Sequence, residues 1–299
     1  MNEKKKCPNC GLLIDEDMNK CPYCGFLIED KKDDKVASAS EIEEPKKVIN
    51  ENKTKQRWIT FAERRDVETK KEIFLFLFMV LGLSFISTFV QILTAISNRF
   101  FLSSQTGEAM INFSIYLIAF GICLFVIGND ISKIFNKFKV GRTYLYGIGY
   151  GFLLVMASAL YSLFTVLVFG DVGSNNNENS IDSIIANFPI LSLIVFSFLG
   201  PICEEFGYRL GLFSFLRKYN RIVAYIVSAI IFGFIHFDFE SFGNLESLKI
   251  ELINIPSYII SGLILCYVYD KEGVETSIIC HITNNFIAII STVFVSLYL

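Results

Sequence analysis

The strongest constraint on this chain is a series of apolar runs that are long enough to cross a lipid bilayer. A helix needs about 20 residues to cross the hydrocarbon layer, and several stretches after residue 72 reach that length with few charges. Hydrophobic residues make up 53% of the 299 positions, which few soluble domains approach. We therefore predict an all-α polytopic membrane protein with about seven transmembrane helices. The expected spans are 73–95, 110–128, 144–170, 188–216, 222–238, 250–269 and 276–298.

Charge predicts the orientation of these spans. Lys and Arg are concentrated before the first span, in the loop near 133–142 and in the turn near 217–221, whereas the loop 171–187 has three acids and no Lys or Arg. Cytoplasmic loops of membrane proteins carry an excess of basic residues. The pattern predicts a multi-pass protein of the cell membrane with a cytoplasmic N-terminus. The net charge of −3 gives no reason to expect nucleic acid as a partner.

Two copies of a Cys-Pro-x-Cys-Gly motif lie in the first 28 residues. Four thiolates in two such pairs suit a tetrahedral structural zinc site, and reduced thiols agree with a cytoplasmic location. Two disulfides, a redox CxxC and rubredoxin-type iron are the alternatives, and duplication of the motif favours zinc. We predict a zinc ribbon over residues 1–28 whose ligands are Cys7, Cys10, Cys21 and Cys24.

The segment between the ribbon and the first span divides into two parts. Residues 29–57 are rich in Lys, Glu, Asp, Asn and Ser, which predicts a disordered charged linker. Residues 58–71 combine Trp58 and Phe61 with several Lys and Arg, which predicts a basic segment on the inner leaflet. More linker is the alternative for this second part.

Ionisable residues well inside the expected spans are few, and each is costly in lipid. They are Glu204, Glu205 and Arg209 in the fourth span, His236 in the fifth and His281 in the seventh. Glu205 and Arg209 are four residues apart in the order that favours an ion pair within one helix. Glu204 points about 100° away around the helix, so it lacks this local cation.

Spacing places the other polar residues relative to Glu204. Glu204 and His236 each lie about 20 Å along their helices from the turn near 217–221, at about 1.5 Å per residue, so they can face each other. His281 and Asn285 share one helix face, which favours Asn285 as the partner of His281. A Glu beside a His can hold and deprotonate a water molecule, and His281 with Asn285 can donate hydrogen bonds to a developing oxyanion.

These residues form three ordered motifs: EExxxR from Glu204 to Arg209, FxxxH from Phe232 to His236, and HxxxN from His281 to Asn285. Their order and spacing resemble the CAAX protease and bacteriocin-processing family, also called CPBP or Abi, over residues 185–295. The resemblance implies an intramembrane endopeptidase domain, here 72–299, acting on a membrane-associated protein or peptide. It implies that Glu204 and His236 activate water and that His281 and Asn285 stabilise the oxyanion, with Glu205, Arg209 and Phe232 in supporting roles. Two His and a Glu could hold zinc, but the resemblance favours glutamate-dependent hydrolysis without a catalytic metal.

Three other interpretations remain open from the sequence. The polar residues could form a purely structural network, or the site could belong to a proton-coupled transporter, although no inverted repeats are evident. The chain could also be a non-catalytic membrane scaffold whose zinc ribbon regulates a cytoplasmic partner.

Overall fold

The structure is a computed structural model that describes residues 4–6, 13–16, 18–19, 28, 67–97 and 105–298. The chain forms two compact units, Met1–Arg65 and Asp66–Leu299. Three predictions lie outside the described residues: the four cysteine ligands of the ribbon, the disordered linker 29–57, and most of the basic interfacial segment.

The N-terminal unit contains a short antiparallel hairpin. Strand β1 (Lys4–Lys6) pairs with β2 (Leu13–Asp15), and Lys5 lies opposite Ile14. The first CPxCG motif lies between the two strands in the sequence, as the predicted ribbon requires.

The second unit is helical throughout the part that the structure describes. Its first half contains α2 (Thr69–Leu77), η1 (Phe78–Gly82), α3 (Leu83–Ser97), α4 (Gln105–Ile127), η2 (Gly128–Asp130), α5 (Ile131–Lys137), α6 (Gly141–Phe169) and α7 (Asn176–Asn187). Its second half contains α8 (Pro189–Ser192), η3 (Leu193–Leu199), α9 (Gly200–Glu204), η4 (Glu205–Phe213), α10 (Ser214–Arg217), α11 (Arg221–Phe234), η5 (Phe239–Gly243), α12 (Leu245–Glu272) and α13 (Val274–Tyr298). The segments η1, η3 and η4 are π-helical, and η2 and η5 are 3₁₀ turns.

Six helical stretches among the described residues are long and apolar enough to cross a membrane, so the protein is a multi-pass membrane protein. They are Thr69–Leu93, Ala109–Asp130, Gly141–Phe169, Pro189–Arg217, Leu245–Glu272 and Val274–Val295. The expected fifth span is the shorter helix α11, which has 14 residues. The expected sixth span is longer than predicted, because α12 continues through Pro256 without a break.

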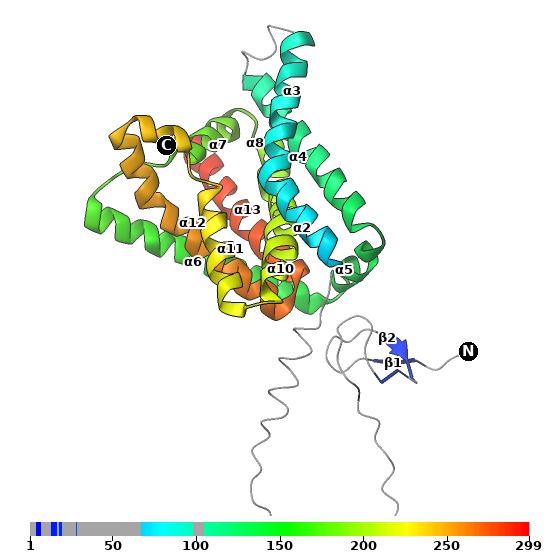
Figure 1. The fold of residues 1–299 in the computed structure, drawn as a ribbon. Coiled ribbons are helices and arrows are strands. Elements are labelled where there is room, and N and C mark those ends of the chain that lie inside the picture. Colours follow the sequence, from blue (N-terminus) through cyan, green and yellow to red (C-terminus); the bar gives the residue numbers. More distant parts are fainter. Residues whose placement is uncertain are drawn as a thin grey trace, which may run out of the picture. The chain divides into compact units, whose positions relative to one another are not determined.

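The last helix, α13, lies in the middle of this unit and packs on α6, α12 and the fourth span (Figure 1). Glycines bring α6 very close to α13. A Cβ atom at Gly147 would lie 2.5 Å from Ile279 Cβ, and one at Gly151 would lie 2.5 Å from Thr283 Cβ. Small residues spaced four apart let membrane helices approach in this way, and the approach holds α13 in position within the bundle.

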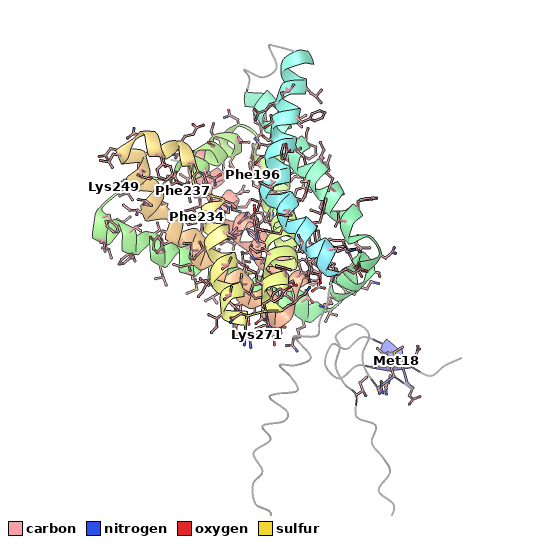
Figure 2. The ribbon with its side chains drawn as sticks, in the orientation of Figure 1. Met18, Phe196, Phe234, Phe237, Lys249 and Lys271 are labelled. Carbon is pink, nitrogen blue, oxygen red and sulfur yellow. The ribbon has the colours of Figure 1, made fainter. Side chains whose placement is uncertain are left out.

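Helix α12 runs between the two ends of the helical unit, and ion pairs tie one of its ends to a basic turn. Lys249 and Lys271 mark opposite ends of α12, and Phe234 and Phe237 lie toward the Lys249 end (Figure 2). Near the Lys271 end, Asp270 forms ion pairs with Arg217 and Arg221. The basic turn that sets the predicted orientation is therefore tied to the end of α12.

The expected loop 171–187 contains an unpredicted helix, α7. The Asn175 side chain accepts a hydrogen bond from the Glu178 backbone N–H and so caps the first turn of α7. Asn at the cap position with Glu three residues later is a signature of helix starts. The Asn-rich composition concealed this signature among residues that also favour turns.

Candidate active site

The fourth span carries both glutamates and is not a regular α-helix. The short helix α9 ends at Glu204, with π-helical turns on either side of it. Pro201 has no backbone N–H to donate to the preceding turn, and local π-helical turns can satisfy the freed groups in a membrane helix. The fourth span is therefore irregular around Gly200 and Pro201, and π-helical turns are frequent at functional sites.

The predicted ion pair between Glu205 and Arg209 is confirmed. Arg209 Nη1 lies 3.4 Å from Glu205 Oε1, and the two side chains are 1% and 0% exposed. The guanidinium carbon of Arg209 also lies 4.1 Å from the ring centroid of Phe232. A buried cation in lipid needs such partners, so Arg209 and Glu205 depend on each other.

His281 lies between the two glutamates, one at each ring nitrogen. Its Nδ1 lies 3.0 Å from Glu205 Oε1, and its Nε2 lies 3.9 Å from Glu204 Oε2. A carboxylate can only accept, so Nδ1–H donates to Glu205 and Nε2 is turned toward Glu204. Ser277, one turn earlier on α13, donates its hydroxyl to Glu205 Oε2. The sequence argument separated the two glutamates correctly but did not predict that both would meet the same histidine.

His236 lies just beyond the C-terminal end of α11, two residues later than its last helical residue. Its Nδ1 lies 2.8 Å from the backbone carbonyl oxygen of Phe232. Because that oxygen only accepts, Nδ1 carries a hydrogen, and in the neutral ring Nε2 then has the free lone pair. The Phe232 ring centroid lies 5.0 Å from that of His236 and 5.9 Å from that of His281. The predicted supporting residue Phe232 thus contacts both histidines and Arg209.

Asn285 makes different contacts from those predicted. Its amide nitrogen donates to the backbone carbonyl of Phe196 at 2.9 Å, and its oxygen accepts from Asn284 at 3.0 Å. The side chain points toward the fourth span, where η3 presents the Phe196 carbonyl oxygen as an acceptor. Asn285 is therefore held by Phe196 and Asn284, and not by the predicted bond to His281.

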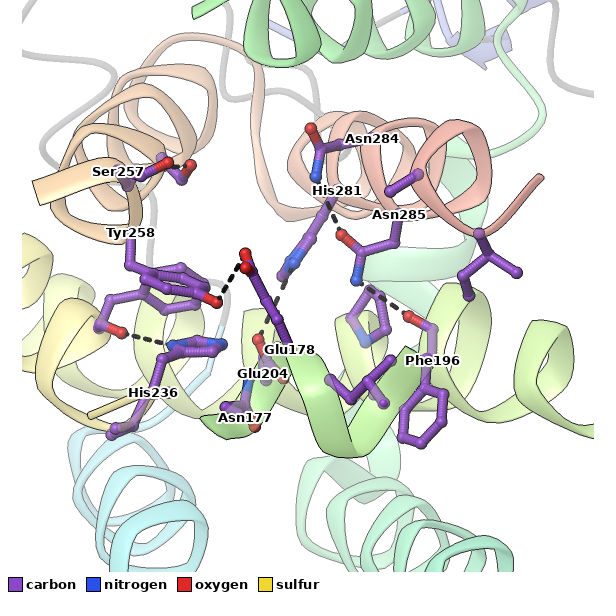
Figure 3. A pocket seen from close by; sticks show the side chains of 18 of the residues that line it. Asn177, Glu178, Phe196, Glu204, His236, Ser257, Tyr258, His281, Asn284 and Asn285 are labelled. Atoms are coloured by element: carbon purple, nitrogen blue, oxygen red, sulfur yellow. Dashed lines mark hydrogen bonds and ion pairs between the residues drawn. The ribbon is translucent and has the colours of Figure 1, made fainter. Parts of the chain in front are cut away.

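A cavity of about 1220 Å³ brings these groups together. Glu204, His236, His281 and Asn285 all line it (Figure 3), whereas Glu205 and Arg209 are buried and are not among its lining residues. Residues of α7 also line it, including Glu178 and Asp182. All four predicted catalytic residues therefore share one cavity.

Two carboxyl groups of α7, those of Glu178 and Asp182, line this cavity. Loss of water around the carboxyl end of each side chain raises the pKa of Glu178 and the pKa of Asp182. Hydrogen bonds partly oppose this effect, from Tyr258 and Ser174 at Glu178 and from Thr292 at Asp182. Burial thus favours the neutral form of both carboxyl groups.

The described part of the chain shows no group of three His, Cys, Asp or Glu side chains arranged to hold a metal ion. In the membrane unit, Cys123, Cys203, Cys266 and Cys280 are free and buried, as expected for small packing residues.

Two families match the chain. The family described as type II CAAX prenyl endopeptidase Rce1-like matches residues 186–287, and a zinc-ribbon domain matches residues 3–28. The chain therefore contains an Rce1-like CAAX protease domain. This domain includes all three motifs and every cavity residue named as catalytic, and the zinc-ribbon match includes all four cysteines predicted as ligands.

Two relatives carry part of the same sequence. An "Uncharacterized protein" of Mycoplasma capricolum is 27% identical over 187 residues, which are 58% of this chain and 51% of the relative. The "Putative membrane peptidase YdiL" of Bacillus subtilis is 27% identical over 140 residues, which are 46% of this chain and 57% of that protein. The chain thus spans about half the length of the curated relatives it matches. No solved structure is significantly similar.

Sequence reasoning missed three residues that shape the site: Ser277, Tyr258 and Glu178. Ser277 lies four residues before His281 and so faces the same way, which the spacing could have indicated. Tyr258 and Glu178 carried no such signal, because their contacts with the site depend on how α7 and α12 pack.

Proposed function

We propose that this protein is an intramembrane endopeptidase in which Glu204 is the general base. The observation that carries the proposal is that Glu204 Oε2 has no hydrogen-bond partner among the described residues. This oxygen is buried, yet its side chain reaches a large cavity beside His281. An unpaired carboxylate oxygen in such a place is suited to bind and deprotonate a water molecule.

The hydrolysis follows from the groups around Glu204. Water gives a proton to Glu204, and its oxygen forms a bond to the carbonyl carbon of the scissile peptide. The tetrahedral intermediate collapses, the C–N bond breaks, and the proton on Glu204 passes to the leaving nitrogen. The neutral His236 ring, with its Nε2 lone pair, helps to hold the attacking water.

His281 and Asn285 suit the oxyanion. Glu205 accepts a hydrogen bond from Nδ1–H of His281, which leaves Nε2 for the cavity, and an Nε2–H there would donate to the oxyanion. Asn285 uses one amide N–H for the Phe196 carbonyl, and its second N–H remains for substrate. Donors fixed in place before reaction are the most effective at stabilising developing charge.

The substrate class follows from the membrane setting. A cavity enclosed by membrane helices suits a membrane-associated protein or peptide, through CAAX-type cleavage or processing of bacteriocin or envelope peptides. The N-terminus is cytoplasmic in this proposal, which rests on the distribution of Lys and Arg. The thiolates of Cys7, Cys10, Cys21 and Cys24 would hold a structural zinc ion, which would stabilise the fold of the ribbon.

A second function is favoured by the ribbon itself. The zinc-ribbon match at residues 3–28 lies wholly outside the Rce1-like domain, which suits a module that binds a cytoplasmic partner. The membrane unit would then act as a regulatory scaffold without hydrolysis.

Comparison of protein and peptide termini in native cells separates these functions. The strains are wild type, a deletion, Glu204→Ala, and Glu246→Ala as a control at an exposed site outside the cavity, with the abundance of each variant matched. If Glu204→Ala loses the cleavage events that the deletion loses, the protein is a peptidase and those termini identify its substrates. If Glu204→Ala restores everything lost in the deletion, the scaffold function replaces this proposal.

A further inference from the structure

The His236 ring makes one hydrogen bond within the part of the chain that the structure describes, from Nδ1 to the Phe232 carbonyl oxygen. Because His236 lies beyond the end of α11, it lacks the support of a continuing helix. One bond fixes the position of one nitrogen but leaves the plane of the ring free to tilt. Orientation of the Nε2 lone pair therefore needs a further contact.

Tyr258 of α12 supplies that contact. Its ring stacks on the His236 ring, with centroids 4.4 Å apart and planes 14° from parallel. Figure 3 shows the Tyr258 ring lying over His236, with its hydroxyl directed toward Glu178. Flat stacking at this distance restricts tilt of the imidazole while leaving the edge that carries Nε2 uncovered.

The Tyr258 ring is fixed in turn by the start of α7. Its hydroxyl donates to Glu178 Oε1 at 3.3 Å and accepts from the Asn175 amide at 3.2 Å. The same Asn175 caps α7 through the Glu178 backbone N–H. The Asn175 side chain thus links the first turn of α7 to the orientation of Tyr258.

We propose that Tyr258 is a positioning residue for His236, and that Asn175 and Glu178 act through Tyr258 to orient the ring. The catalytic role of His236 rests on the proposed function, but its orientation can be measured without any activity. Three side-chain contacts of Tyr258 thus connect α7, a helix outside the membrane spans, to His236.

Nitrogen-15 NMR of the two histidines tests this proposal in the full-length protein in detergent. The protein has only two histidines, and His281→Gln serves to assign the signals. In wild type, His236 should show the single tautomer with hydrogen on Nδ1, and Tyr258→Phe, which keeps the stacked ring but loses the bonds to Asn175 and Glu178, should show a partial shift. In Tyr258→Ala and Tyr258→Leu, the signal should shift toward a mixture of tautomers. The His281 signal, fixed by Glu205, should stay in place and so report an intact fold.

Tyr161→Ala is the matched control. Tyr161 is also partly buried and also bonds to α12, through the Ile253 carbonyl at 2.6 Å, but it does not line the cavity. It should leave both histidine signals unchanged. An unshifted His236 signal in both Tyr258→Ala and Tyr258→Leu would overturn the proposal.

The cleavage events lost in the Glu204→Ala strain provide the second readout. At matched abundance, Tyr258→Ala should slow their appearance by about 10-fold to 100-fold, the range expected for misplaced catalytic groups, and Tyr258→Phe, which keeps only the stacked ring, should give a rate between those of Tyr258→Ala and wild type. Normal rates in Tyr258→Ala with a shifted His236 signal would also overturn the positioning role. If Glu204→Ala loses no cleavage event, the proposed function fails, while the NMR result still decides whether Tyr258 orients His236.

Discussion

The buried pair of Glu205 and Arg209 allows a quantitative test of what holds the site together. At the observed 3.4 Å, two unit charges attract by about 5 kcal/mol in an effective dielectric of about 20. Removal of one partner leaves the other charge buried, which typically costs about 3–5 kcal/mol. We expect Glu205→Gln and Arg209→Met each to lower the free energy of unfolding by about that amount.

The double variant distinguishes the pair from two independent contacts. With both charges absent, no unpaired ion remains, and the amide oxygen introduced by Glu205→Gln would still accept one of the two hydrogen bonds that Ser277 and His281 donate to separate oxygens of Glu205. The loss should therefore fall short of the sum of the single losses by about 2–3 kcal/mol. Unfolding by denaturant titration in detergent micelles measures all three values, with the exposed Glu246→Gln as the control. Additive losses would refute the reasoning.

The neighbouring residue should behave in the opposite way. Glu204 is 16% exposed in its side chain, and its Oε2 has no hydrogen-bond partner in the described structure. Glu204→Gln should therefore change stability by less than about 1 kcal/mol, the range for sites without such features, while abolishing the cleavage events. Two adjacent glutamates would then separate stability from activity.

Three further predictions concern packing, pH and metal. Gly151→Leu should lower the free energy of unfolding by at least about 1–3 kcal/mol through overpacking against α13. A Cβ atom at Gly149 would have no neighbouring atom within 4 Å, so Gly149→Leu should unfold at the wild-type denaturant concentration. The pKa of Glu178 is raised above its ordinary 4.5, so its contribution to stability is present below that value and is lost as pH rises through the raised pKa; Glu178→Gln should flatten this slope in unfolding measured from pH 4 to 8. Elemental analysis should find about one zinc per chain and a loss of most of it in Cys7→Ser, and full zinc retention in that variant would contradict a four-cysteine site.

Local interactions explain which features of the site could be predicted. The Glu205–Arg209 pair depends on spacing within one helix, and Phe232 meets His236 because the two are four residues apart. The resemblance carried by the three motifs also implied that Glu204, His236, His281 and Asn285 act at one site, and all four line one cavity. The two local contacts need only helix geometry and a short list of ionisable groups in apolar surroundings.

Contacts between helices could not be predicted in the same way. Asn285 bonds to the Phe196 carbonyl because a π-helical turn presents that oxygen, and no spacing rule gives this. Tyr258 stacks on His236 because α12 runs unbroken through Pro256, where the sequence suggests an interruption. The sequence predicts a loop where α7 lies, because Asn and Ser favour both caps and turns.

The sequence by itself determined that this protein lies in a lipid bilayer and which ionisable residues could form its site. Runs of apolar residues require a bilayer, and the few ionisable groups within them require partners or a function. The tertiary structure alone decided which partners those are. Glu204 and Glu205 both lie beside His281, the Asn285 amide donates to a backbone carbonyl, and Tyr258 stacks on His236. The physical reason is that hydrophobicity and helical spacing are properties of local sequence. Ring stacking and side-chain hydrogen bonds instead depend on distances of a few ångströms between helices that are far apart in sequence.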